Sequence, residues 1–285
     1  MRGVASSLLA LIFLAGAPSV EAETRENVWS AVGAPSGGPA RAIGGVAHGC
    51  LSGAVRLPDD GPGYEVIRLS RRRDFGHPAL IAFIERLGRR GQAAGLPSFY
   101  VGDMAQPRGG PLPYGHASHQ TGIDVDIWFT PAPVTPLPRA AREDVELPSM
   151  LRPASHAIDP ARFGRSQVRL LRLAAQDPAV DRIFVNAAIK EALCRGVGGA
   201  AEGGRDWLAR LRPWYGHDEH FHVRLRCPEG SSECEAQAPP PPGDGCDRTL
   251  AWWRDKPLPH PALAEPPPAP APALPAACRA LLSAP

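Results

Sequence analysis

Residues 122–129 restrict the fold most, because apolar and polar side chains alternate along them. This pattern predicts a β-strand with two unlike faces. The apolar positions are Ile123, Val125 and Ile127, and the positions between them are Asp124, Asp126 and Trp128. Residues 219–227 alternate in the same way and carry His220 and His222 on one face. Each strand therefore offers chemically active side chains on the face opposite its apolar residues.

The remaining periodic segments mix helices with strands. Residues 78–94 place apolar side chains at helical spacing, and Gly95 stops the pattern. Further helices are expected from Asp159 onward, at 186–195 and at 207–212, and further strands at 98–101 and 182–185. Because these elements follow no strict βαβ rhythm, we predict an α+β fold with a central antiparallel sheet, flanking helices and long loops.

Composition limits the partners that the chain can have. The 285 residues carry 31 Lys and Arg against 29 Asp and Glu, so there is no strong positive field to attract nucleic acid, and we expect no such partner. Proline and glycine are abundant, at 34 and 30 residues, but 44% of the chain is hydrophobic. This combination favours a loop-rich folded domain with proline-rich flanks over a low-complexity chain.

The first 22 residues have the layout of a secretory signal peptide. Arg2 precedes an apolar run at residues 8–17, and small residues lead to Ala22, after which we expect cleavage. The alternative, a membrane anchor, needs about 20 apolar residues, and no later segment reaches that length either. We therefore predict an exported protein with no membrane span after signal removal, located in the periplasm if the source is a bacterium.

The mature chain is expected to have three parts. Residues 23–47 are polar and glycine-rich and predict an extended N-terminal arm, whereas residues 48–235 hold the periodic elements and form the folded domain. Residues 236–285 are rich in proline, which disfavours regular hydrogen-bonded structure. Two cysteines in this last segment indicate that it wraps the domain.

All six cysteines follow the signal peptide, and an even number in an exported chain predicts three disulfides. Six cysteines allow 15 pairings, of which the short loop between Cys227 and Cys234 is the easiest to close. A thiolate zinc site is not expected, because the sequence contains no Cys-x-x-Cys pair.

Histidines and carboxylates gather in two clusters. The first cluster contains His116 and His119 near Asp124 and Asp126, and the second contains His217, His220 and His222 with Asp218 and Glu219. Zinc accepts imidazole and carboxylate ligands where thiolates are absent, and a catalytic site needs three of them with a fourth position open. A solvated polar surface is the alternative for any single histidine, but two clusters in an exported chain favour zinc.

The sequences around both clusters resemble a group of zinc peptidases. Residues 115–126, GHASHQTGIDVD, resemble the His-x6-Asp element of the group that includes lysostaphin, the D-Ala-D-Ala metallopeptidases and the hedgehog fold. Residues 214–224, WYGHDEHFHVR, resemble its His-x-His element. With RIFVN at 182–186 and RLRCP at 224–228, the chain is most similar to the penicillin-insensitive murein endopeptidase family. The resemblance covers most of the mature chain and implies that residues 48–235 are a zinc metallopeptidase domain.

The resemblance also implies roles for individual residues. The catalytic zinc ligands would be His119, Asp126 and His222. His220, the first histidine of His-x-His, would be the base that accepts a proton from water. His217 would steady the attacking water or the developing oxyanion.

Two further features follow from the same resemblance. His116 matches a position used for a second, weaker metal, to which His156 could also belong, although Pro153 stands where the family has a companion carboxylate. The implied disulfides are Cys50 with Cys278, Cys194 with Cys246, and Cys227 with Cys234.

The implied activity is that of a zinc-dependent, penicillin-insensitive endopeptidase that hydrolyses the D-alanyl-diaminopimelate cross-links of peptidoglycan. Penicillins acylate a serine, and the sequence has no Gly-x-Ser-x-Gly nucleophile motif. The alternatives are a non-catalytic envelope protein in which zinc stabilises a peptidoglycan-binding surface, and a D,D-carboxypeptidase. Asp124 either orients a ligand histidine or is a surface carboxylate. Arg108 either binds a substrate carboxylate or is a solvated loop residue.

Overall fold

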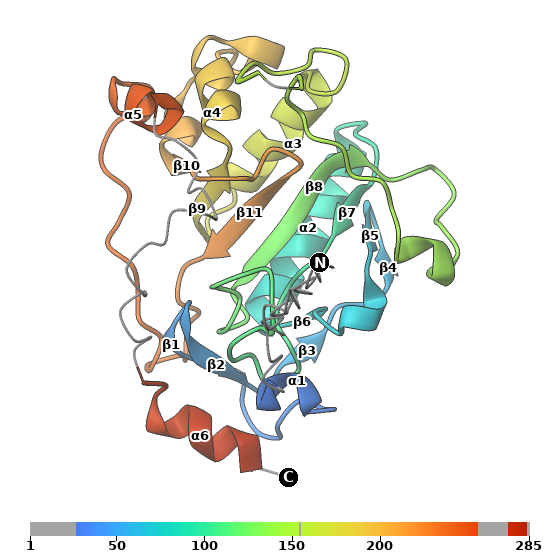
Figure 1. The fold of residues 1–285 in the computed structure, drawn as a ribbon, viewed down its shortest axis with the longest axis vertical. Helices are drawn as coiled ribbons and strands as arrows, with labels where there is room; N and C mark the ends of the chain where they lie inside the picture. The colour runs from blue at the N-terminus through green and yellow to red at the C-terminus, as the bar shows by residue number, and fades with distance from the viewer. Residues whose placement is uncertain (1–26, 154, 256–272, 284–285) are drawn as a thin grey trace, which may run out of the picture.

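A computed structural model describes residues 27–153, 155–255 and 273–283 (Figure 1). The expected signal peptide, residues 1–22, lies outside these residues. The largest sheet has seven strands in the order β10-β9-β11-β8-β7-β5-β4. These strands are β4 (Asp60–Gly61), β5 (Tyr64–Val66), β7 (Phe99–Val101), β8 (Asp124–Pro131), β9 (Val180–Val185), β10 (Leu211–Pro213) and β11 (His220–Leu225).

Antiparallel pairing holds the middle of this sheet. The pairs β9–β11, β11–β8 and β8–β7 are antiparallel, whereas β10–β9 and β5–β7, nearer the two edges, are parallel. Each parallel pair is joined through a helix, α2 (Pro78–Ala93) or α4 (Ala187–Cys194), as a crossover between parallel strands requires. The predicted α+β class with an antiparallel centre is confirmed, and the parallel pairs are an addition to it.

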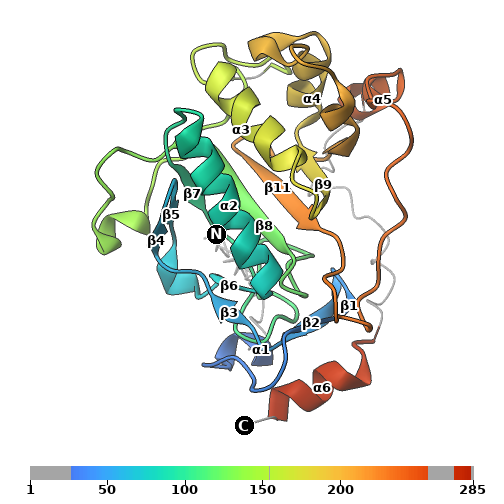
Figure 2. The ribbon, with the colours of Figure 1, turned by 180° about the vertical axis from the view of Figure 1, so that it is seen from behind.

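Two helices cover one face of the sheet (Figure 2). They are α2 and α3 (Arg165–Ala175). Val125 and Ile127 of β8 are fully buried and belong to the same hydrophobic core as Ile84 of α2 and Leu171 of α3. Because successive strand residues point to opposite faces, the polar residues of β8 lie on the other side of the sheet.

The starts of α2 and α4 agree with the sequence. The Nδ1 atom of His77 accepts a hydrogen bond from the backbone N–H of Ala79 at 3.1 Å, and Pro78 occupies the first helical position. In the same way, the side chain of Asn186 accepts a hydrogen bond from the N–H of Ala188 at 2.9 Å and caps α4. Local side-chain caps therefore set both boundaries.

Two of the expected helices are placed differently in the structure. Helix α3 begins at Arg165 rather than at Asp159, because the carboxylate of Asp159 accepts a hydrogen bond from the N–H of Ala161 and holds a turn instead. The helix expected at 207–212 is a 3-10 helix, η4 (Asp206–Arg210), followed directly by β10. The backbone of Leu211–Pro213 pairs with β9, and this pairing with a distant strand ends the helix.

The prediction of an extended arm at 23–47 is wrong for the part that is described. Helix α1 (Val28–Ala31) precedes β1 (Arg41–Gly45), which forms an antiparallel hairpin with β2 (His48–Ser52). Trp29 and Ile43 are buried in a small apolar cluster with Cys50 and Cys278. The glycine-rich sequence of β1 does not predict a strand, because pairing with β2 and packing of Ile43 stabilise it.

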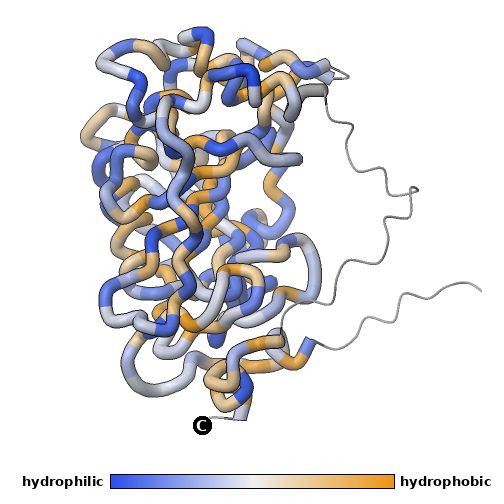
Figure 3. The backbone as a smooth tube through the Cα atoms, turned by 90° about the vertical axis from the view of Figure 1, so that its left-hand side faces the viewer, coloured by the Kyte–Doolittle hydropathy of each residue, from blue (hydrophilic) through white to orange (hydrophobic). Residues whose placement is uncertain are grey.

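The remaining elements lie around the sheet. They are β3 (Val55–Arg56), β6 (Phe75–Gly76), the 3-10 helices η1 (Leu69–Arg71), η2 (Arg139–Arg142) and η3 (Val197–Gly199), and, in the C-terminal segment, α5 (Thr249–Asp255) and α6 (Ala276–Ser283). None of the helices within the described ranges is long and apolar enough to span a bilayer. Accordingly, the coloured tube in Figure 3 shows only short orange stretches.

All three implied disulfides form in the structure. They are Cys50–Cys278, Cys194–Cys246 and Cys227–Cys234. The first ties α6 to strand β2, and the second ties the chain just before α5 to the end of α4. The proline-rich C-terminal segment is therefore fastened to the domain at two points.

Candidate metal centre

The register of two central strands assembles the first half of the site. Strands β8 and β11 pair so that His222 lies opposite Asp126, and His220 opposite Trp128. The Nδ1 atom of His222 is 3.2 Å from Oδ1 of Asp126. The rings of His220 and Trp128 have centroids 4.9 Å apart. Such cross-strand neighbours share one face of the sheet, and here that face is opposite the hydrophobic core.

Asp124 contacts His222 and the backbone of His119. Its side chain is fully buried, and Oδ1 lies 2.7 Å from Nε of Arg224 and 3.2 Å from Nε2 of His222. Its Oδ2 accepts a hydrogen bond from the backbone N–H of His119 at 3.1 Å. Burial alone would raise the pKa of Asp124, but Arg224 and His222 hold that pKa well below its usual value. Asp124 is therefore a buried anion beside two candidate ligands and not a surface carboxylate.

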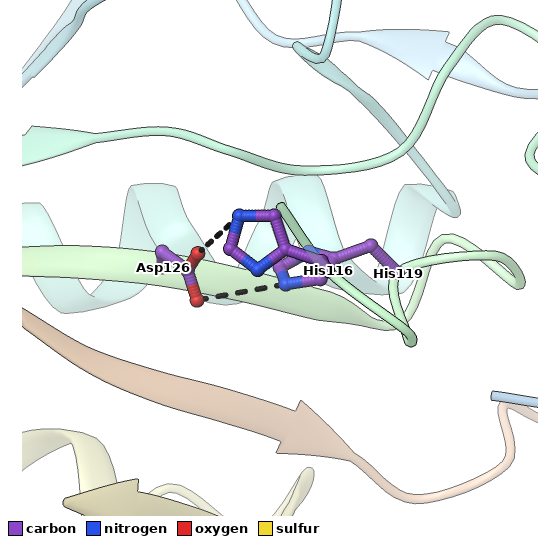
Figure 4. Close-up of side chains that lie close together, drawn as sticks. All are labelled: His116, His119 and Asp126. Carbon is purple, nitrogen blue, oxygen red and sulfur yellow. Dashed lines mark ion pairs between the residues drawn. The ribbon is translucent and has the colours of Figure 1, made fainter. Parts of the chain in front are cut away.

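The second half of the site comes from the loop between β7 and β8. His119 adopts a left-handed backbone conformation with φ of 67°, and its Nε2 is 3.6 Å from Oδ1 of Asp126. His116 approaches the other carboxylate oxygen, with Nε2 at 3.5 Å from Oδ2 (Figure 4). The loop joins β8 through Gly122, where φ is 69° and a Cβ atom would lie 2.3 Å from the side chain of Leu51. Only glycine fits this junction.

The chemistry of the buried atoms fits a metal ion. The ring nitrogens of His119 and the Oδ1 atom of Asp126 are buried and have no hydrogen-bond partner within the described chain. Two ligands held about 2.0–2.1 Å from a tetrahedral zinc ion lie about 3.3 Å apart, close to the observed separations of 3.2 and 3.6 Å. Ligand atoms of His116, His119 and Asp126 lie within 4.8 Å of one another, and His222 approaches the same carboxylate from β11.

The protonation states also suit metal binding. Burial lowers the pKa of His119, which keeps the imidazole neutral and its lone pair available. Burial would raise the pKa of Asp126, but His119 and His220 hold it well below its usual value, so the carboxylate is charged. Burial would lower the pKa of His222, but Asp124 and Asp126 raise it above its usual value, so a metal that binds this imidazole displaces a proton. The site therefore presents a carboxylate and imidazole nitrogens, a donor set that zinc accepts.

Asp103 is a site residue that the sequence did not reveal. Its Oδ2 atom is 3.3 Å from Nε2 of His116, 2.7 Å from Nη1 of Arg73 and 3.1 Å from Nη1 of Arg71. Burial would raise its pKa, but His116 and the arginines lower the pKa of Asp103 to about 2. Asp103 thus orients His116 against Asp126. The only sequence signal was an acidic residue just after the strand expected at 98–101.

His220 lies between two carboxylates. Its Nε2 is 3.8 Å from Oδ1 of Asp126, and its Nδ1 is 3.7 Å from Oε1 of Glu219. Burial would lower the pKa of His220, but Asp126 and Glu219 raise it above its usual value. A histidine whose second nitrogen faces an anion is suited to accept a proton at the first.

His217 has a fixed orientation next to His220. Its backbone is left-handed, with φ of 54°, and its ring centroid is 4.9 Å from that of His220. Its Nδ1 lies 2.6 Å from the carbonyl oxygen of Tyr215. A carbonyl can only accept, so Nδ1–H donates, which leaves Nε2 as an acceptor in the neutral ring. Burial and the neighbouring histidines lower the pKa of His217 to about 4, so it is neutral at pH 7.

A cavity of about 440 Å³ opens beside these residues. Its lining combines candidate site residues with aromatic and cationic side chains, namely His116, His217, His222, Phe184, Trp214, Arg182 and Arg224. An extended peptide could reach the carboxylate–imidazole cluster through this cavity.

Two residues considered from the sequence lie elsewhere. Arg108 is buried, and its guanidinium donates to the backbone carbonyls of Ala34 and Leu281, so it is neither solvated nor free for a substrate carboxylate. His156 is exposed in the loop closed by the bridge between Leu151 and Ile158. Within the described ranges, no ion pair or ring contact joins His156 to the cluster.

Comparison with known proteins gives a consistent result. Residues 42–283 match the family model described as penicillin-insensitive murein endopeptidase. A protein of that name from Klebsiella pneumoniae is 43% identical over 285 residues, which cover 99% of this chain and 98% of the relative. Those from Haemophilus influenzae and Salmonella newport are each 44% identical, over 248 and 258 residues. These alignments cover 87% and 89% of this chain, and 84% and 90% of the relatives.

Proposed function

Because the chain belongs to the penicillin-insensitive murein endopeptidase family, we propose that it is a zinc-dependent enzyme that hydrolyses the D-alanyl-diaminopimelate cross-links of peptidoglycan. Family membership itself supports the broader statement that the chain is a peptidoglycan peptidase. The finer proposal rests on the buried Asp126 carboxylate, whose Oδ1 has no hydrogen-bond partner in the described chain and faces nitrogens of His119 and His222 within 3.6 Å.

The proposed zinc ligands are His119, Asp126 and His222. His116, which lies against the second oxygen of Asp126, is proposed as a ligand of a second, weaker metal. Asp124 is proposed to orient His222, whose Nε2 faces Asp124 while its Nδ1 faces Asp126, as ligand imidazoles commonly direct their other nitrogen to such a group. Asp103 is proposed to position His116, because it lies against the same Nε2 atom that faces Asp126. A zinc ion bound there supplies Lewis-acid polarisation of the scissile carbonyl and makes a bound water more acidic.

The protein groups would carry the protons of the reaction. Nε2 of His220 would accept a proton from the attacking water as the water oxygen adds to the carbonyl carbon. The same atom would return that proton to the nitrogen of the leaving amine when the C–N bond breaks. Glu219, on the far side of the ring, would stabilise the charged imidazolium between these two steps.

His217 would position the water and not the oxyanion. Its neutral ring presents a lone pair at Nε2, because Nδ1–H is committed to the Tyr215 carbonyl. A lone pair can accept a hydrogen bond from water but cannot donate one to a developing negative charge. This narrows the two roles that the sequence left open.

The proposal extends to the arrangement of the whole chain. A peptidoglycan substrate fits a location in the cell envelope, and we propose that residues 1–22 direct export to the periplasm. Residues 48–235 would form the metallopeptidase domain, and residues 236–285 would wrap it.

The test is an assay of the mature protein, from about Glu23, on purified cross-linked muropeptide dimers in the presence of penicillin. Conversion to monomers that a chelator blocks and zinc restores is the expected result, with products identified by mass. Intact dimers despite stoichiometric bound zinc would indicate a binding protein instead. Loss of a terminal D-alanine alone would indicate a carboxypeptidase.

A further inference from the structure

A cluster of aromatic side chains adjoins the cavity, which Trp214 lines. We call Trp214, Tyr215, Trp252 and Trp253 the aromatic platform. Trp253 of α5 contacts both residues of the loop before β11, with ring centroids 5.6 Å from Trp214 and 5.3 Å from Tyr215. Trp252 stands perpendicular to Trp253 at 5.0 Å. Two segments far apart in the sequence therefore build one continuous surface of rings.

The platform is open to solvent and is held rigidly. Trp214 is 50% exposed and Trp252 is 55% exposed, and they are the two exposed tryptophans of the described chain. The backbone N–H of Trp214 donates to the backbone carbonyl of Val185 at 2.9 Å. The Cys194–Cys246 disulfide fastens the chain shortly before α5. Contiguous exposed apolar surface marks interaction sites, and tryptophan and tyrosine are enriched there.

The platform continues into the candidate metal centre through Phe184. The Phe184 ring lies 5.7 Å from that of Trp214 and 5.4 Å from that of His222. The Trp214 ring is therefore no more than about 11 Å from the His222 ring along this path. Three extended residues span about 10–11 Å, so at most about three residues of an extended peptide separate Trp214 from His222.

A short peptide of the substrate in the proposed function can span that distance. In peptidoglycan a short stem peptide joins each cross-link to a sugar of the glycan strand. A stem that lies extended through the cavity would place its sugar on the platform. Sugar rings have apolar C–H faces and polar edges, and indole rings have matching apolar faces with an N–H at the edge.

We propose that the aromatic platform binds the glycan strand of peptidoglycan by stacking on its N-acetylated sugar rings. This inference rests on the proposed function, because it takes the cleaved bond to belong to a peptide attached to that strand. The continuity with the cavity favours a glycan over a lipid surface, which would require no alignment with the metal centre. Trp252, which lies farthest from the cavity along the chain of ring contacts, would hold the next sugar.

The test compares two cross-linked substrates, one that carries its disaccharides and one from which they have been removed. For Trp252→Ala we expect the ratio of kcat/KM for the sugar-bearing over the sugar-free dimer to fall about tenfold, equal to about 1.4 kcal/mol. Trp252→Phe, which keeps a ring, should restore most of the ratio. Val134→Ala is the control. Val134 is fully exposed in the loop after β8, so this substitution removes apolar surface outside the platform.

A ratio that stays the same in Trp252→Ala would overturn the glycan proposal while leaving the proposed function intact. If the parent protein cleaves neither dimer, the proposed function fails, and binding is then measured without turnover. Tryptophan fluorescence of the metal-free protein is titrated with an N-acetylglucosamine tetrasaccharide, and saturable quenching that Trp252→Ala weakens supports the platform as a sugar site. No quenching, or Trp252-dependent binding to phosphatidylglycerol vesicles instead, overturns it.

Discussion

Residues of the candidate metal centre that lie on strands are held differently from those that lie on loops. The strand half comprises Asp124, Asp126, His220 and His222, and the loop half comprises His116, His119 and His217. Register fixes the strand half, because a one-residue slip of β11 against β8 would turn its histidines to the hydrophobic side. The loop half relies on left-handed backbone at His119 and His217, with φ of 67° and 54°. Each such conformation persists only where surrounding contacts impose it.

The difference indicates how the site divides its tasks. The strands hold the carboxylate of Asp126 opposite the imidazole of His222. The loops bring further imidazole nitrogens to that pair. Loss of a strand residue should therefore have a large effect on metal binding, turnover or stability, whereas loss of a contact that only orients a loop residue should have a smaller one. The four predictions below test this ordering from the largest effect to the smallest.

Asp126→Ala should have the largest effect, because Asp126 touches both halves of the site. We expect turnover to fall at least about 1,000-fold, corresponding to about 4 kcal/mol, and bound zinc to be lost in elemental analysis. Asp206→Ala, which removes an exposed carboxylate from η4, is the control. Stoichiometric zinc in Asp126→Ala would show that the carboxylate is not a ligand.

His220→Ala should remove catalysis but keep the metal. Loss of a general acid–base group lowers turnover by about 100- to 10,000-fold, while zinc content should match that of the parent protein. The measurement pairs steady-state turnover with elemental analysis on the same sample. Zinc loss equal to that of Asp126→Ala would mean that His220 is a ligand and that the base has been assigned wrongly.

Asp124→Asn should weaken both the metal site and the fold. The substitution leaves the buried Arg224 without its anion, a loss of about 3 kcal/mol, or roughly 6–12 °C in Tm. Zinc affinity should fall about 10- to 100-fold because His222 loses its partner.

The double variant Asp124→Asn with Arg224→Met separates these effects. Removing both charges should recover stability, measured by thermal unfolding, without recovering zinc affinity. Recovery of zinc affinity together with stability would show that Asp124 acts on the fold alone. Asp124 would then not belong to the strand half of the metal centre.

Asp103→Asn should have the smallest effect, about tenfold in zinc affinity or turnover, because it orients the loop residue His116. A double-mutant cycle with His116→Ala tests the route. In the His116→Ala background, Asp103→Asn should add little, since the residue it orients is already gone. An undiminished tenfold loss there would place the role of Asp103 elsewhere, on Arg71 and Arg73.

Local patterns in the sequence were sufficient to predict the strand half. Alternation at 122–129 and 219–227 predicted β8 and β11 because a period of two is a property of each strand by itself. Helix α2 was equally clear, since its apolar spacing, Pro78 and Gly95 all lie within one segment. Strand pairing, in contrast, depends on residues far apart in the sequence. The first residues of β10 were therefore predicted as the end of a helix, which the pairing with β9 interrupts.

The sequence indicated which residues form the loop half of the candidate site, but not how their side chains are oriented. The motif around His116 and His119 identified these residues, yet their orientation depends on Asp103, which follows a different strand. Arg108 shows the opposite case, because its loop suggested a binding role and its contacts with Ala34 and Leu281 are structural. Contacts between segments far apart in the chain determine both the orientation of His116 and the role of Arg108. Such contacts cannot be predicted from the periodicity of the sequence.

The Cys50–Cys278 disulfide sets an order of events in the making of this protein. Its two cysteines are 228 residues apart, so Cys278 is synthesised only after every strand of the seven-stranded sheet. Cys50 in the β1–β2 hairpin cannot form this disulfide until α6 has been synthesised, and disulfides of this kind form in oxidising compartments. A chain cut short before Cys278 would leave the Cys50 thiol open to cross-linking with another molecule.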